Sequence, residues 1–142
     1  LMLLDRVRSP RLREWALRHL DKPRTVSQAF TYLEKNAHRS DLPLLLEVMK
    51  KWRDDLDVHH DLTLSVLALT CRPSNEMLQE VFEWTACEYC RLSAAHILAK
   101  RGLLTESQRY ELEFDAYHFA RRYARKRKGS LDARSRLLES RA

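Results

Sequence analysis

The chain of 142 residues carries 26 Lys/Arg and 20 Asp/Glu, a formal net charge of +6, and 44% of its residues are hydrophobic. This length suits one domain with a hydrophobic core, and the apolar fraction is too high for a disordered chain. A bilayer span takes about 20 apolar residues, and the apolar runs here are far shorter, so we expect no membrane segment and no signal segment.

Residue usage favours helix along nearly the whole chain, because glycine occurs only twice and β-branched residues are few. The three cysteines are an odd number without the spacing of a disulfide framework. We therefore expect a reducing, cytoplasmic environment.

Helix start and stop signals divide the chain into seven or eight helices joined by short turns, which indicates antiparallel neighbours. Ser9, followed by Pro10, begins the first helix, and Ser74 or Asn75 begins the fifth. The first six helices are predicted over 10–20, 26–37, 41–52, 57–71, 75–84 and 88–101. The seventh is predicted as one long helix from Thr105 to Lys128, and a short eighth follows Ser130.

Two capping boxes and one glycine sharpen these boundaries. Thr25 with Gln28, and Thr105 with Gln108, have the spacing at which side chain and backbone cap each other. Gly102 has the position of a helix-ending residue.

Leucines and aromatic rings recur on one side of each predicted helix, so we expect the following rings in the core: Trp15, Phe30, Trp52, Phe82, Trp84, Phe114 and Phe119.

Residues 9–104 resemble HEAT repeats, whose first helix has a Pro-x-Leu-Leu start and whose second has an early arginine and an alanine-rich inner face. The matching residues are Pro43, Leu45 and Leu46 in one helix, and Arg91, Ala94, Ala95 and Leu98 in another. The predicted fold is all-α, either a short HEAT-like solenoid or a compact array of seven or eight antiparallel helices. Residues 1–128 form its helical domain and 129–142 a basic tail. The resemblance implies a non-enzymatic module that binds macromolecules.

Cys87 and Cys90 form a Cys-x-x-Cys pair, a spacing at which two thiolates hold one zinc ion. Cys71 or His96 would then complete the site. The alternatives are a redox dithiol and two small side chains that pack between helices. Because no second ligand pair accompanies the motif, packing is favoured, and we expect no metal and no cofactor.

His60–Asp61 resembles the core of HD-type metal phosphohydrolases, which are also helical. Such an enzyme needs a further histidine and a further aspartate, for which the candidates are His19 or His38 and Asp115. A simpler interpretation is that the acids around residue 57 stabilise the N-terminal end of a helix. We expect no enzymatic activity, and the phosphohydrolase stays an alternative.

Two charged clusters are candidate surfaces for a partner. Asp54, Asp55 and Asp57 would contact a protein. The basic run would contact nucleic-acid phosphates or an acidic protein, and it consists of Arg121, Arg122, Arg125, Lys126, Arg127 and Lys128. No base-reading motif accompanies it, so any nucleic-acid binding would have no strong sequence preference. A further alternative is the helical tail of a larger enzyme, such as a defence-type reverse transcriptase.

Overall fold

The computed structural model describes residues 7–115 and 118–126, and all regular secondary structure within those ranges is helical. The predicted all-α class is therefore confirmed. The chain divides into two compact units, Leu1–Ile97 (the first unit) and Leu98–Ala142 (the second unit). The boundary proposed from the sequence, after Lys128, lies outside the described residues.

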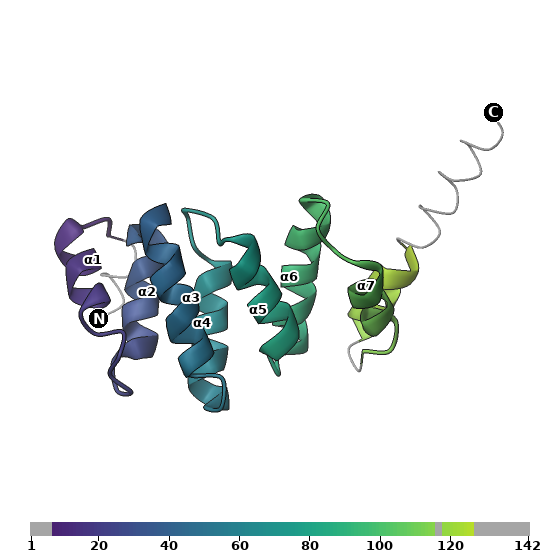
Figure 1. Ribbon diagram of the computed structural model, residues 1–142, viewed down its shortest axis with the longest axis horizontal. Helices are drawn as coiled ribbons and strands as arrows, with labels where there is room; N and C mark the ends of the chain where they lie inside the picture. The colour runs from purple at the N-terminus through teal and green to yellow at the C-terminus, as the bar shows by residue number, and fades with distance from the viewer. Residues whose placement is uncertain (1–6, 116–117, 127–142) are drawn as a thin grey trace. The chain divides into compact units, whose positions relative to one another are not determined.

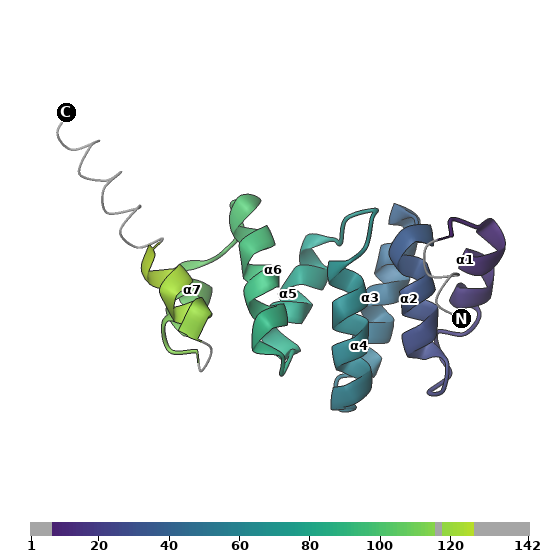
Figure 2. The same ribbon diagram turned by 180° about the vertical axis from the view of Figure 1, so that it is seen from behind.

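The described residues of the first unit form six α-helices and one short 3-10 helix (Figures 1 and 2). They are α1 (Pro10–Leu17), α2 (Val26–Asn36), η2 (Arg39–Asp41), α3 (Leu42–Lys51), α4 (Leu56–Leu67), α5 (Asn75–Trp84) and α6 (Glu88–Lys100), whose last turn passes into the second unit. Helix α2 packs against both α1 and α4, whereas α3 packs against α5. Alternate helices are thus neighbours, as in an array of two layers. No described helix combines the length and the apolar character that a membrane span requires.

Local signals set several helix ends as predicted. The Ser9 hydroxyl accepts a hydrogen bond from the Leu12 amide, and the Ser74 hydroxyl accepts one from the Met77 amide at 3.2 Å. Gly102 has φ +73° and donates its amide to Ala99, while Leu103 donates to Leu98. This pair of bonds is the Schellman motif that ends helices at glycine.

The capping box predicted at Thr25 is wrong, although α2 begins beside it. The Thr25 side chain makes no capping bond, because its hydroxyl donates to the carbonyl of His19 at 3.2 Å. Gln28 donates to the Tyr32 hydroxyl at 2.9 Å instead of reaching back to Thr25. Contacts with neighbouring turns therefore replaced the local motif.

Helix α4 also ends at Leu67, earlier than the sequence predicts.

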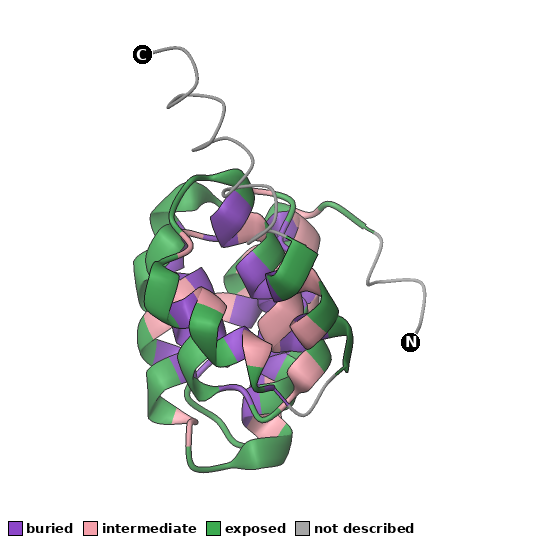
Figure 3. Ribbon diagram, turned by 90° about the vertical axis from the view of Figure 1, so that its right-hand side faces the viewer, coloured by how far each residue is buried: buried purple, intermediate pink, exposed green. Residues whose placement is uncertain are grey.

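The buried apolar side chains are mainly those of leucine, alanine, valine and methionine with a few aromatic rings, and helices carry both buried and exposed positions (Figure 3). Phe30 and Phe82 are almost completely buried, as predicted. Trp84, Phe114 and Phe119 are exposed, at 50%, 69% and 47%, so their assignment to the core is wrong. Trp84 instead lies under the guanidinium of Arg53, 4.1 Å from its carbon, an arrangement typical of a cation–π contact.

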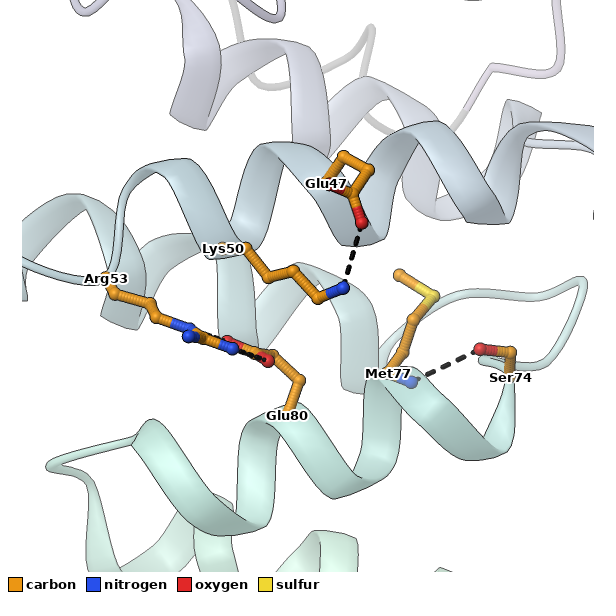
Figure 4. A network of polar contacts seen from close by, with 6 residues as sticks. All are labelled: Glu47, Lys50, Arg53, Ser74, Met77 and Glu80. Carbon is orange, nitrogen blue, oxygen red and sulfur yellow. Dashed lines mark hydrogen bonds and ion pairs between the residues drawn. The ribbon is translucent and has the colours of Figure 1, made fainter.

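Two ion pairs with one buried carboxylate each connect segments of the first unit. Arg13 donates two hydrogen bonds to Asp41, of 2.8 and 2.5 Å. Arg53 donates two to Glu80, both of 2.5 Å, between the end of α3 and the middle of α5 (Figure 4). By contrast, the pair formed by Glu47 and Lys50 in the same view lies on the surface of α3.

The second unit contains α7 (Glu106–Glu113), and its capping box is the one that forms as predicted: Thr105 and Gln108 exchange two bonds of 3.1 Å. The prediction of one continuous helix to Lys128 is wrong. Helix α7 ends at Glu113, and residues 118–126 are helical again.

Candidate functional site

One group of three possible metal ligands occurs among the described residues: His60, Cys87 and Cys90. One ligand atom from each side chain lies within 4.8 Å of the other two. The group contains neither Cys71 nor His96, the residues that sequence reasoning paired with the cysteines. Cys90 is buried, Cys87 is half-buried and His60 is exposed, so the group extends from the interior to the surface.

The helical array explains why His60 joins the two cysteines. His60 lies in the first half of α4, Cys87 directly precedes α6, and Cys90 lies in its first turn. The ligand atoms of these residues lie close together, so the N-terminal part of α4 approaches the start of α6. The only sequence signal for this convergence is that all three residues lie near the starts of even-numbered helices.

Hydrogen bonds hold the cysteine turn in place. The Cys87 amide donates to the Thr85 hydroxyl at 3.2 Å, and Arg91 donates to the Thr85 carbonyl at 3.1 Å. The Cys90 amide donates to the Cys87 sulfur at 3.3 Å. The two sulfurs are therefore positioned by the backbone and by a buried threonine.

Burial dominates the chemistry of the cysteine thiols. It raises the pKa of Cys90 to about 12, and the hydrogen bond with Cys87 acts in the same direction. Burial also raises the pKa of Cys71. A buried thiol whose pKa is this high is a poor nucleophile at neutral pH, because the thiolate is the reactive form.

The other residues weighed for an HD-type centre are not in this ligand group. It contains His60 but not Asp61, His19 or His38. The His19 ring stacks on Trp15 with 4.2 Å between the ring centroids, and the amide of His38 donates to Asp41 at 2.8 Å. Asp115 is buried in the second unit. Among the described residues, the possible ligands grouped with His60 are Cys87 and Cys90.

The acidic cluster of Asp54, Asp55 and Asp57 lines an open cavity of about 690 Å³ together with Trp52 and Leu56. Two of the three acids have a local structural role. Asp55 caps α4 by accepting a hydrogen bond from the Val58 amide at 3.1 Å, and Asp57 lies in the first turn of that helix. Both positions place a negative charge at the positive end of the helix.

The basic run is only partly described. Arg122, Arg125 and Lys126, which we call the cationic face, are exposed on the helical segment 118–126. Arg121 is half-buried, and its guanidinium donates to the carbonyl of Asp115 at 2.6 Å. Arg127 and Lys128 lie outside the described residues.

A second cavity, of about 400 Å³, is one that sequence reasoning missed. Its lining includes Arg8, Arg13, Lys35, His38 and Cys71. Because these residues come from the N-terminal segment, α1, α2 and the turn after α4, no local pattern brings them together. Arg13 is already neutralised by Asp41.

Comparison of the chain with protein-family models, with curated proteins and with solved structures found no match.

Proposed function

We propose that this chain is a non-enzymatic, HEAT-like interaction module whose second unit binds nucleic acid through its phosphates. The separation of charge between the two units carries the proposal. The first unit has 14 Lys/Arg and 14 Asp/Glu, a net charge of zero, whereas the second has 12 Lys/Arg and six Asp/Glu, a net charge of +6. The whole excess of positive charge thus belongs to one compact unit.

The cationic face has the geometry of a phosphate-binding surface. Arg122, Arg125 and Lys126 are three and four residues apart, a spacing that places them on one side of a helix. Ala120 and Ala124 are buried on the opposite side. No ion pair joins these three cations to a carboxylate within residues 7–115 and 118–126. Their charges therefore remain available to an external anion.

Exposed aromatic rings in the same unit support a nucleic acid over an acidic protein. Tyr110 and Phe114 are 60% and 69% exposed, and their ring centroids are 4.8 Å apart. Phe119 is exposed on the turn of helix next to the cationic face. Bases of a single strand stack on such rings with about 1–3 kcal/mol each, without regard to sequence.

The stacking of α2 on α4 and of α3 on α5 supports the HEAT-like interpretation of the first unit. Arrays of this kind present extended surfaces for macromolecules. Since Asp55 and Asp57 act locally on α4, the acidic cluster gives weaker support to a protein partner than the cationic face gives to nucleic acid.

Fluorescence anisotropy with a labelled random single strand tests the proposal. Replacing Arg122, Arg125 and Lys126 together by serine should weaken binding at 50 mM salt by about tenfold or more, because three phosphate contacts are lost. A matched control replaces Arg11, Lys22 and Arg24, three exposed cations of the first unit, and should bind like wild type. Equal weakening by both triple variants would show only a general charge effect.

A second pair of substitutions separates nucleic acid from an acidic protein. Tyr110→Ala with Phe114→Ala should weaken binding of a single strand more than binding of a duplex, whose bases are already stacked. If instead wild type binds polyglutamate as tightly as it binds the single strand, and the double variant binds both unchanged, the partner is an acidic protein.

A further inference from the structure

We propose that His60, Cys87 and Cys90 form a Zn²⁺ site that ties the N-terminal part of α4 to the start of α6. The juxtaposition of two sulfurs and one imidazole, contributed by two separate helices, carries the inference. It is independent of the nucleic-acid proposal, because all three ligands belong to the first unit.

The distances suit a zinc ion. With Zn–S bonds of about 2.3 Å and Zn–N bonds of about 2.0 Å, tetrahedral geometry separates the ligand atoms by about 3.5–3.8 Å. The ligand atoms here lie within 4.8 Å of one another, so they need to approach by about 1.3 Å at most. The His60 side chain is exposed and has room to rotate, whereas the cysteines are held by Thr85 and by the backbone.

The donor types select the metal. Two sulfurs and one imidazole nitrogen favour a borderline-soft ion such as Zn²⁺, while Mg²⁺ and Ca²⁺ require oxygen ligands. Binding displaces the two thiol protons, so that two thiolates and a neutral imidazole neutralise the ion's charge. The three side chains leave the fourth tetrahedral position for a water molecule.

The turn before α6 is built to keep the sulfurs in place. The Cys90 amide donates to the Cys87 sulfur, and an amide in this position stabilises a thiolate that holds a metal. Arg91 and the Cys87 amide both bind Thr85, which is 98% buried. These hydrogen bonds fix the turn that carries the two sulfurs. Two cysteines that only filled space between helices would not need such bonds.

Cobalt substitution tests the site directly on the reduced full-length chain. Titration with Co²⁺ should produce a sulfur-to-metal charge-transfer band and visible bands of tetrahedral cobalt that saturate at one ion per chain, and Zn²⁺ should then remove both. Cys87→Ser and Cys90→Ala should abolish the charge-transfer band. His60→Ala should weaken Co²⁺ binding by at least about tenfold, in line with the loss of one ligand of three.

Matched controls and a folding check keep the test decisive. Cys71→Ser and His96→Ala alter the residues that lie outside the group and should bind Co²⁺ like wild type. Because Cys90 is buried, its variant must first show wild-type circular dichroism. Where Cys90→Ala fails to fold, the weaker Co²⁺ binding expected of His60→Ala, altered at an exposed position, tests the site instead. No charge-transfer band in wild type, or a band that survives His60→Ala and disappears in His96→Ala, would overturn the proposal.

Discussion

Truncation of Glu80 is the sharpest test of how the first unit is held together. The Glu80 side chain is 5% exposed and accepts two hydrogen bonds of 2.5 Å from Arg53, whose own side chain is 28% exposed. Removal of one partner of a buried ion pair costs about 3–5 kcal/mol, because the other charge loses its compensation. Since Arg53 keeps some contact with water, we expect the lower limit, about 3 kcal/mol, for Glu80→Ala.

Urea unfolding followed by circular dichroism measures this loss. With a slope of about 1.5 kcal/mol per molar urea, the midpoint should fall by about 2 M. Glu47→Ala breaks the exposed pair with Lys50 in the same region (Figure 4) and should cost less than about 0.5 kcal/mol. The double variant Arg53→Met/Glu80→Leu should recover most of the stability, because no charge is left buried.

A midpoint of Glu80→Ala within about 0.5 M of the wild-type value, or equal destabilisation by Glu47→Ala, would contradict the prediction. Either result would mean that the Arg53–Glu80 pair is no better protected from water than a surface pair.

The remaining predictions concern the core, a buried amide and a buried imidazole. Leu69→Asp and Leu98→Asp should each unfold the chain at room temperature by circular dichroism, because both positions are buried and neither offers the charge a partner. Asn36→Ala should cost about 2 kcal/mol in urea unfolding, since Asn36 bonds the Ser9 amide at 2.6 Å and two backbone carbonyls. Burial lowers the pKa of His59, so the unfolded chain binds its proton first. Stability should therefore be full above about pH 6.5 and decrease as the pH falls below it, and His59→Leu should remove that decrease in melts at pH 7 and 5.

Helix starts and ends could be predicted from the sequence where four or five residues decide them. The Ser9 and Ser74 caps, the Thr105 capping box and the Gly102 terminus all have their partners within one turn of helix. The capping box predicted at Thr25 did not form, since the Thr25 hydroxyl donates to the carbonyl of His19 in the preceding turn.

The interruption after Glu113 could not be predicted, because the stretch from Thr105 to Lys126 contains neither glycine nor proline. The carbonyl of the buried Asp115 accepts a hydrogen bond from Arg121, six residues later, and no sequence pattern indicates this contact. His60 was missed as a partner of the cysteines for a related reason. Whether ligands from two helices converge is decided by which helices lie side by side. A motif within one stretch of sequence does not show this.

The dependence of nucleic-acid affinity on salt tests the central claim most directly. For a random duplex, each phosphate contact contributes about 0.9 to the slope of log affinity against log salt concentration. Between 50 and 200 mM salt, the variant with serine at Arg122, Arg125 and Lys126 should therefore show a slope that is shallower by about 2.7 than wild type. The triple variant at Arg11, Lys22 and Arg24 should keep the wild-type slope. A wild-type affinity that does not change with salt, or one slope shared by all three proteins, would contradict binding of phosphates by the second unit.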